Sequence, residues 1–174
     1  MRVGRLNPLF TPEQIAERTR NLAEEIERHY AGQDMVLVCV LKGSFMFFAD
    51  LVRCLHTRPL VDFVRVSSYG NGTEAREPRC SKDVDLPLEG RHVLLVEDIV
   101  DTGGTVDFLK RHILGKGAAS VRVVTLLNKI ARRKVDVFVD FSGFAIPDSF
   151  VVGYGLDYAE QYRELPGIFE AIPE

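Results

Sequence analysis

One stretch of the sequence decides the fold: Val93-Leu-Leu-Val-Glu-Asp-Ile-Val-Asp-Thr-Gly-Gly-Thr105. Its first four residues are apolar and predict a strand that is buried on both faces, as in a parallel sheet. Three carboxylates follow, Glu97, Asp98 and Asp101, and adjacent glycines and threonine hydroxyls then lead into a predicted helix over 105–115. Glycine amides, hydroxyls and the positive end of a helix together favour a bound anion. The stretch therefore predicts a phosphate cradle at the end of a strand.

The carboxylates beside this cradle indicate what kind of phosphate it holds. They suit a sugar phosphate, because acids at such a site hold Mg²⁺ or ribose hydroxyls and one of them can accept a proton. The alternative is a helix start that is merely capped by Asp101 or Thr102. That alternative leaves the adjacent acids Glu97 and Asp98 at the end of a buried strand without partners, which is costly.

Apolar periodicity away from this stretch predicts alternating strands and helices. Thr11-Pro12-Glu13-Gln14 combines a capping hydroxyl, a proline and a glutamine, so a helix is expected from about 12 to 30. Strands are expected at 35–41, 61–66, 92–96, 121–127 and 135–139, with a short one at 150–152, and helices at 45–55 and 105–115. Strands that alternate with helices indicate an α/β fold, here one domain over 1–174, with a mostly parallel central sheet flanked by helices.

Length, charge and cysteine content exclude several classes of protein. A chain of 174 residues with 46% hydrophobic residues buries one sizeable core, which excludes a multi-domain machine and a disordered protein. The net charge of −3 gives no general attraction to nucleic acid or anionic lipid, and no apolar stretch approaches the roughly 20 residues that span a bilayer. Cys39, Cys54 and Cys80 form no CxxC pair and are interpreted as buried thiols of a reducing compartment. We therefore expect a cytoplasmic protein without nucleic-acid or membrane partners.

Other motifs have plainer explanations. The polar connection 67–89 is long enough to act as a lid. Within it, Gly70-Asn-Gly72-Thr-Glu-Ala75 matches a dinucleotide fingerprint, but no helix is predicted after it, so a mobile loop is expected. Lys42 follows a buried strand and suits a surface turn as well as a functional role, and Arg132 is assigned to a solvated turn. The histidines have no metal-ligand spacing and are interpreted as solvated or structural: His29, His56, His92 and His112.

Five separated segments together resemble one known family. The stretch 93–105 resembles the phosphoribosyl-diphosphate binding motif of the type I phosphoribosyltransferases. Four further segments occur in the family's order and approximate spacing, and they narrow the resemblance to its hypoxanthine-guanine branch: Leu41-Lys-Gly-Ser44, Ser67-Ser-Tyr-Gly70, Lys129, and Ile146-Pro-Asp-Ser-Phe-Val-Val-Gly-Tyr-Gly-Leu-Asp-Tyr158 with Arg163.

The resemblance implies an enzyme of purine salvage, a pentosyltransferase that works with Mg²⁺. It would transfer the 5-phosphoribosyl group from phosphoribosyl diphosphate to a 6-oxopurine, hypoxanthine and/or guanine, and release IMP or GMP with pyrophosphate. It also implies a type I phosphoribosyltransferase fold with a core at about 35–140, a long mobile loop, and a base-binding hood formed by the N-terminal segment and about 144–174. A homodimer or a homotetramer is expected.

The resemblance also assigns roles to individual residues. Asp101 would be the catalytic proton acceptor for the five-membered ring of the purine, and the Leu41–Lys42 peptide would be cis. Gly104 stands where the family varies, so no side chain contributes there. The phosphoribosyl group would be held by Glu97, Asp98, Asp101, Thr102, Gly103, Gly104 and Thr105, pyrophosphate by Lys42, Gly43 and Arg163, the purine by Lys129, Phe150, Val151 and Asp157, and the metal by Glu97, Asp98 and Asp157, with Ser68 and Tyr69 on the lid.

Two alternatives remain beside this function. A regulator with the same fold would sense phosphoribosyl diphosphate while binding RNA or DNA. Such a protein is expected to show a basic face and to lose its proton acceptor or base-recognition residues, whereas this chain is acidic and retains Asp101, Lys129 and Asp157. The closer alternative is an enzyme that prefers xanthine, or hypoxanthine over guanine. Small shifts around Val151 and Leu156 would determine that preference.

Overall fold

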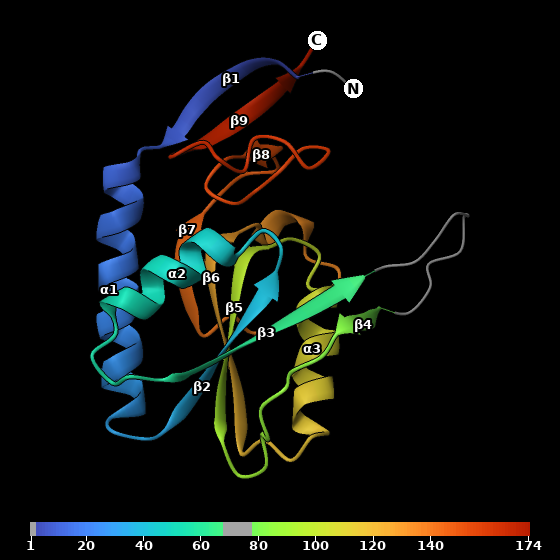
Figure 1. Ribbon diagram of the computed structural model, residues 1–174. Coiled ribbons are helices and arrows are strands. Elements are labelled where there is room, and N and C mark those ends of the chain that lie inside the picture. The colour runs from blue at the N-terminus through green and yellow to red at the C-terminus, as the bar shows by residue number, and fades with distance from the viewer. Residues whose placement is uncertain (1–2, 68–77) are drawn as a thin grey trace.

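A six-stranded sheet forms the centre of the protein, with the strand order β4-β3-β2-β5-β6-β7 (Figure 1). The computed structural model describes residues 3–67 and 78–174. Neighbouring strands from β3 to β7 run parallel, whereas the edge strand β4 runs antiparallel to β3. The α/β fold with a mostly parallel sheet is thus confirmed. The strands are β2 (Met35–Leu41), β3 (Leu60–Ser67), β4 (Arg79–Lys82), β5 (His92–Val100), β6 (Ser120–Asn128) and β7 (Phe141–Ala145).

Three helices flank this sheet. α1 (Pro12–Tyr30) and α2 (Phe45–Cys54) cover one face, and α3 (Gly104–Leu114) covers the other (Figure 1). The predicted capping box starts α1: the Thr11 hydroxyl accepts from the Gln14 N–H at 3.3 Å, and the Thr11 N–H donates to the Gln14 side chain at 2.9 Å. Reciprocal bonds of this kind satisfy two of the amides that a helix start leaves without a helical partner. The three predicted helices are confirmed.

The core consists of two apolar clusters, one on each face of the sheet. Leu37 and Leu94 pack with α1 and α2, whereas their neighbours Val36 and Val93 pack with α3. Successive side chains of a strand point to opposite faces, so both faces of β2 and β5 are buried. Little room for polar groups remains in the middle of the sheet. Polar side chains that could bind a ligand are therefore expected at the ends of its strands.

A second, smaller sheet joins the two ends of the chain. It contains β1 (Val3–Phe10), β9 (Ile168–Pro173) and β8 (Val151–Val152), all antiparallel, and it lies beyond the carboxyl ends of the parallel strands (Figure 1). The short strand at 150–152 was predicted, but β1 and β9 were not. Pro8 interrupts the pattern of β1, which pairs along one side only and has an irregular register between Pro8 and Phe10. Proline is tolerated at a sheet edge because no ladder hydrogen bond is required there.

The prediction of a strand at 135–139 is wrong. The structure has β7 at Phe141–Ala145 instead, preceded by the single-turn helix η1 (Ile130–Arg132). The N–H groups of Lys134 and Val135 donate to the Thr102 carbonyl, at 3.0 and 3.1 Å, rather than to β6. The chain reaches β6 only at Asp140, whose N–H donates to the Val123 carbonyl. Alternating Val135, Val137 and Val139 therefore mark an extended segment without a strand partner.

The polar connection 67–89 holds the short strand β4, which sequence patterning missed. Ser68, Tyr69 and the fingerprint at 70–75 lie outside the described residues. None of the described helices combines the length and the apolar character that crossing a membrane requires.

Candidate active site

A cavity of about 290 Å³ opens at the carboxyl edge of the central sheet. Ligands of open parallel sheets bind beyond this edge, because loops from several strands converge there. The lining comes from the ends of β2, β3 and β5 and from the start of α3: Val40, Leu41, Lys42, Gly43, Val66, Glu97, Asp98, Ile99, Val100, Asp101, Thr102, Thr105 and Val106. The structure thus brings the predicted phosphate cradle and the predicted pyrophosphate loop to one hollow.

The turn between β5 and α3 depends on glycine at position 103. Gly103 has a φ of 89°, and a Cβ there would lie 2.8 Å from both the Val135 carbonyl oxygen and a methyl carbon of Val137. A side chain is excluded by backbone conformation and by space. The carbonyl of Thr102 accepts from the N–H groups of Lys134 and Val135, so the same segment that contacts Gly103 also holds the turn by hydrogen bonds. The N-terminus of α3 is therefore held facing the cavity.

Two adjacent carboxylates line the floor of the cavity. Burial, and then the charge of Asp98, raise the pKa of Glu97 well above its ordinary value. Burial also raises the pKa of Asp98, although its side chain accepts from the Ile99 N–H at 2.9 Å. Two neighbouring acids that are both destabilised as anions form a site that a cation would relieve. Their oxygen donors match the ligands that Mg²⁺ prefers.

The loop after β2 approaches these acids so closely that a side chain at position 43 would have to displace the carboxylate of Asp98. A Cβ on Gly43 would lie 1.7 Å from a carboxylate oxygen of Asp98. Gly155 in turn packs on this loop: it has a φ of 97°, and a Cβ there would lie 2.1 Å from the Gly43 carbonyl oxygen. The peptide between Leu41 and Lys42 is cis, as the family resemblance implies. Backbone N–H and C=O groups are consequently brought against the acids without intervening side chains.

Asp101 has one oxygen that is buried and has no hydrogen-bond partner. The nearest cation is Arg132, whose Nε lies 3.5 Å from that oxygen, Oδ1, without forming a hydrogen bond. Arg132 also lies 3.5 Å from Asp148. The expected solvated turn is confirmed for Arg132, whose side chain at the end of η1 is 46% exposed, although its guanidinium also lies near these two carboxylates.

Lys129 is almost fully buried, with a side chain that is 6% exposed. Its N–H donates to the Val100 carbonyl at 3.0 Å, which places the residue beside the end of β5. Its ammonium lies 3.9 Å from Asp148, too far for a hydrogen bond. A buried ammonium ordinarily has close acceptors, because desolvation of a charge is costly. Among residues 3–67 and 78–174, no acceptor lies within hydrogen-bond distance of the Lys129 ammonium.

Phe150 and Val151 stand at the start of β8. The Phe150 ring is 42% exposed and meets Tyr158 edge-to-face, with 5.6 Å between ring centres. Val151 is buried and pairs with Glu170 of β9. The exposed ring of Phe150 lies next to the backbone of Val151, which is fixed by its pairing with β9. Aromatic rings in such positions can stack on a flat heterocycle.

Sequence reasoning missed one acid in the site, Glu160. Its carboxylate lies 2.8 Å from the ammonium of Lys42 and 3.2 Å from the guanidinium of Arg163, which together lower its pKa. Arg163 also contacts Asp157 at 2.8 Å and donates to the Gly155 carbonyl at 2.7 Å. The side chain of Glu160 therefore occupies the two cations that were predicted to bind pyrophosphate. No sequence pattern indicates this contact, because 118 positions separate Lys42 from Glu160.

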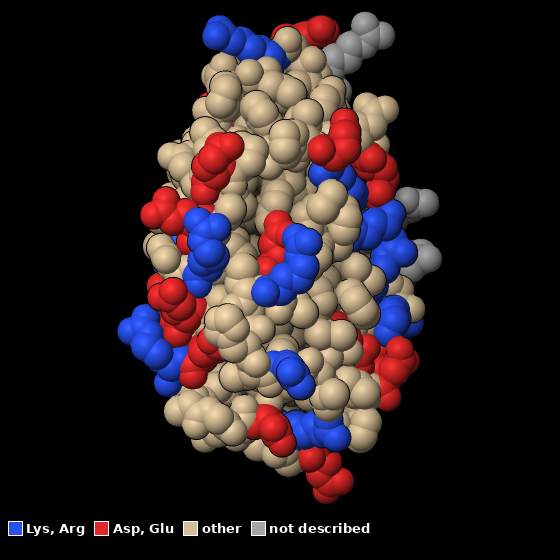
Figure 2. All heavy atoms as spheres, turned by 60° about the vertical axis from the view of Figure 1, so that its left-hand side comes forward, with Lys and Arg blue, Asp and Glu red and all other residues tan. Residues whose placement is uncertain are grey.

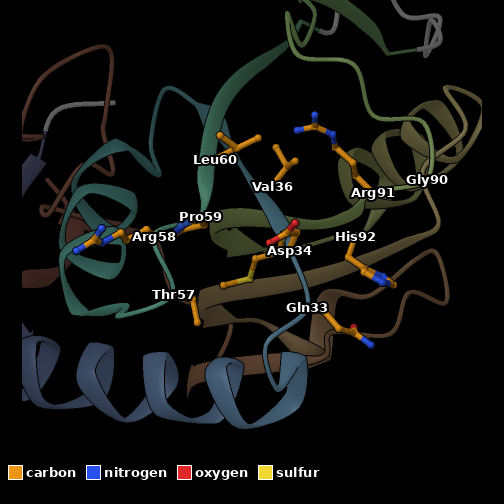
Figure 3. A pocket seen from close by; sticks show the side chains of 11 residues that line it. Gln33, Asp34, Val36, Thr57, Arg58, Pro59, Leu60, Gly90, Arg91 and His92 are labelled. Atoms are coloured by element: carbon orange, nitrogen blue, oxygen red, sulfur yellow. The ribbon is translucent and has the colours of Figure 1, made fainter.

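A larger hollow of about 640 Å³ lies at the opposite, amino edge of the sheet (Figure 3). Residues before β2, β3 and β5 line it, and Arg58 and Arg91 reach it from different segments (Figure 3). None of the predicted site residues is among those that line it. Volume alone does not identify a site, so the smaller cavity with the buried acids is the candidate.

Comparison with known proteins determines the family. The model of the phosphoribosyl transferase domain matches residues 9–159. This chain belongs to the phosphoribosyl transferase family. The hypoxanthine phosphoribosyltransferase of Escherichia coli (strain K12) is 46% identical to it over 162 residues, which cover 91% of each chain. A crystal structure of a hypoxanthine-guanine phosphoribosyltransferase from Bacillus anthracis shares 44% identity and has a TM-score of 0.91, covering 95% of this chain and 98% of that chain.

Another relative of this phosphoribosyl transferase is much longer. The bifunctional protein TilS/HprT of Listeria monocytogenes serotype 4b is 45% identical over 167 residues, which are 95% of this chain. The phosphoribosyl transferase chain spans 26% of the length of that relative. The resemblance inferred from five motifs thus extends over nearly the whole chain.

Proposed function

We propose that this phosphoribosyl transferase moves the 5-phosphoribosyl group of phosphoribosyl diphosphate onto a 6-oxopurine, hypoxanthine and/or guanine. The products are IMP or GMP and pyrophosphate. The observation that carries the proposal is the shared cavity, in which Lys42 and Gly43 line the same hollow as Glu97, Asp98 and Asp101. A ligand that carries a sugar, a phosphate and a diphosphate needs this combination of amides, cations and acids.

The turn from Asp101 to Thr105 is proposed to hold the 5′-phosphate. Its amides and the two threonine hydroxyls supply donors, and the N-terminus of α3 supplies partial positive charge. Gly103 keeps this backbone open because no side chain fits there. Glu97 and Asp98 lie deeper and are proposed to accept hydrogen bonds from the ribose hydroxyls.

The same two acids fit Mg²⁺, which we propose as the metal of this enzyme. Among the described residues, Asp157 does not come together with Glu97 and Asp98 as one compact set of ligands. This separation suits Mg²⁺, which retains several waters and shares substrate oxygens. Bound Mg²⁺ would neutralise negative charge on the diphosphate that leaves. Glu97, Asp98 and Asp157 are proposed as the residues that would hold it, directly or through water.

Asp101 is proposed to accept the proton of the purine. The five-membered ring of the base carries an N–H, and this nitrogen must lose its proton as its lone pair forms the new bond to the anomeric carbon. The bond from that carbon to pyrophosphate breaks at the same time. A buried carboxylate oxygen such as Oδ1 of Asp101, which accepts no hydrogen bond from the described residues, suits the transfer because it remains available to accept the proton.

Recognition of the base is proposed to rest on Lys129, Phe150 and Val151. The 6-oxo group is an acceptor, and the ammonium of Lys129 has donors that no described side chain takes at hydrogen-bond distance. The exposed ring of Phe150 would stack on the purine, while the backbone of Val151 would meet its exocyclic edge. The sheet β1-β9-β8 that holds Phe150 and Val151 would then serve as the hood.

The diphosphate end is proposed to bind Lys42, Gly43 and Arg163. Both cations already hold an anion, the carboxylate of Glu160. We propose that pyrophosphate replaces that carboxylate when substrate binds. Ser68 and Tyr69, which lie outside the described residues, remain predicted members of the lid.

Assembly and location are also proposals. Apolar side chains on α2 and β3 are exposed at the surface, which supports a homodimer or homotetramer through this region: Phe45, Leu60, Val61 and Phe63. Acidic and basic side chains are interspersed on the face in Figure 2, which suits a small-molecule enzyme better than a nucleic-acid partner. Its three cysteines are free thiols, as in proteins of the reducing cytoplasm. Sedimentation of the purified protein would separate dimer from tetramer.

A direct assay tests the proposed function. Purified protein is incubated with phosphoribosyl diphosphate, Mg²⁺ and one base at a time, namely hypoxanthine, guanine, xanthine, adenine or uracil, and the ultraviolet spectrum is followed. We expect nucleotide formation with hypoxanthine, guanine or both. Turnover confined to xanthine would favour the closer alternative, and the absence of turnover with every base would contradict the proposal.

A further inference from the structure

Three side chains of different chemistry converge between β4 and α3, away from the cavity at the carboxyl edge. They are Cys80 in β4, Asp83 just after β4 and His112 in the last turn of α3. One ligand atom of each, the thiol sulfur, a carboxylate oxygen and a ring nitrogen, lies within 4.8 Å of the other two. In residues 3–67 and 78–174, no other three histidine, cysteine, aspartate or glutamate side chains gather so closely.

Two of these side chains are held in place by their neighbours. Nε2 of His112 lies 3.0 Å from Oδ1 of Asp83, and the ring of Phe108 stacks on the imidazole with 5.8 Å between centres and 12° between planes. The Lys116 ammonium lies 2.8 Å from the other carboxylate oxygen, Oδ2. The carboxylate is therefore oriented with Oδ1 toward the imidazole. Ligands that are fixed in this way lose little freedom when an ion binds.

Cys80 completes the cluster from the strand side. It pairs with Val66 of β3, next to a register irregularity, and its thiol is free and half-buried. The cluster is distinct from the proposed active site. His112 comes eight positions after Gly104 in α3, which corresponds to roughly 12 Å along the helix axis.

We propose that Cys80, Asp83 and His112 form a binding site for a transition-metal ion of the zinc class. Thiolate, imidazole and carboxylate are the ligands that zinc takes, at about 2.0–2.3 Å. Ligand atoms around a tetrahedral ion at these bond lengths stand roughly 3.3–3.8 Å apart, so modest side-chain rotations would close the site. Mg²⁺ does not suit it, because Mg²⁺ requires oxygen ligands.

Binding of the ion would release one proton and replace one hydrogen bond. The thiol of Cys80 releases its proton to solvent, and the hydrogen bond between His112 and Asp83 gives way to two metal bonds. Water fills the fourth position. The ion would join β4 to α3 across the edge of the sheet, so binding would stabilise the folded protein.

The competing explanation is an ion-pair network without a metal. In that case Asp83 simply bridges His112 and Lys116, which fastens α3 to the segment after β4. The thiol of Cys80 would then have no role in the network. The two explanations differ in whether the thiol takes part, and a thiolate bound to a metal has its own absorption.

Cobalt titration distinguishes them. The full chain is stripped of metal with a chelator and titrated with Co²⁺ while the near-ultraviolet charge-transfer band of cobalt-bound thiolate is followed. We expect this band to saturate at one ion per chain and to disappear when Zn²⁺ is added, since Zn²⁺ binds such sites more tightly. Zn²⁺ at about a hundred times its dissociation constant should raise Tm by about 5 °C or more. An absent band would overturn the proposal.

Substitutions test which cysteine supplies the metal-bound thiolate. Cys80→Ser should abolish the band and the Zn²⁺-dependent rise in Tm, and His112→Gln should weaken Co²⁺ binding by about tenfold or more. Cys54→Ser is the matched control, because Cys54 is also free and half-buried but lies outside the cluster. It should bind Co²⁺ like the unmodified protein. A band that persists in Cys80→Ser would refute this site. Circular dichroism and Mg²⁺-dependent turnover of Cys80→Ser, both expected unchanged, verify that the variant folds.

Discussion

The hollow at the carboxyl edge of the sheet measures about 290 Å³, whereas the hollow at the amino edge measures about 640 Å³. At the smaller one the backbone is crowded: a Cβ on Gly43 would overlap Asp98. At the larger one a Cβ on Gly90 would meet nothing within 4 Å. The smaller hollow also holds the buried acid Glu97, and one oxygen of Asp101 there is buried without a hydrogen-bond partner among the described residues. We therefore base the proposed active site on buried groups that lack partners and on the close approach of the backbone to them, rather than on cavity volume.

The largest difference in turnover is expected between substitutions of an aspartate at each edge of the sheet. Asp101→Asn should lower turnover by about 10²–10⁴ because it removes the proton acceptor, while the affinity for phosphoribosyl diphosphate remains nearly unchanged. Asp34→Asn at the amino edge is the control and should leave turnover intact. Steady-state rates and calorimetric binding of phosphoribosyl diphosphate measure both effects. Unchanged turnover in Asp101→Asn would remove the proposed acceptor.

The second-largest difference in turnover is expected between alanine variants of Gly43, at the carboxyl edge, and Gly90, at the amino edge. Gly43→Ala forces the Asp98 carboxylate to move, and a displacement of about 1 Å at a reacting centre costs about 10²-fold in rate. Gly90→Ala meets no atoms, but its φ of 69° strains an alanine, so it should lose about 1–2 kcal/mol of stability and keep its activity. Turnover and the free energy of unfolding are measured for both. If Gly43→Ala is as active as Gly90→Ala, the close approach to Asp98 has no functional role.

The cations at the two edges give a smaller contrast. Lys129→Gln should weaken binding of the 6-oxopurine by about 1–3 kcal/mol, because a buried donor to the oxo group is altered. Arg58→Gln, at the exposed end of the amino-edge hollow, should leave base affinity unchanged. Calorimetry with the base in the presence of pyrophosphate and Mg²⁺ compares the two variants. Equal base affinity in Lys129→Gln and the unmodified protein would reject this role.

The smallest effect is expected at Glu160. Glu160→Gln removes the carboxylate that competes for Lys42 and Arg163, and KM for phosphoribosyl diphosphate should fall by about twofold to fivefold, as for exposed ion pairs generally. Glu164→Gln, another acid of the same segment, serves as the control and should not change KM. A rise in KM in Glu160→Gln would mean that Glu160 assists binding of substrate instead of competing with it.

Local patterns predicted much of this molecule because their causes are local. The capping box at Thr11 and Gln14 acts within one helical turn, so α1 was predicted at its observed bounds. Continuous apolar runs predicted β2 and β5 because both faces of a central parallel strand must be buried. The glycine turn that leads into α3 was likewise predicted, since Gly103 and the start of α3 are adjacent in the chain.

Features that depend on distant segments escaped prediction. The alternating valines at 135–139 indicated a strand, but the N–H groups of Lys134 and Val135 donate to the Thr102 carbonyl in the turn before α3 instead. Arg132 is exposed as predicted, but its position 3.5 Å from Asp101 was not predicted. The histidines showed no metal-ligand spacing in sequence, yet His112 lies beside Cys80 and Asp83 once β4 and α3 pack together.

The sequence by itself determined the parallel sheet, its helices and the acidic phosphate turn, because burial periodicity, capping and glycine conformations act between residues a few positions apart. Only the tertiary structure decided how the chain ends pair in β1 and β9, which acid pairs with Lys42, and where Lys129 is buried. Those outcomes depend on contacts between residues tens to more than a hundred positions apart. Such contacts are selected by packing and charge in the folded chain and have no local pattern.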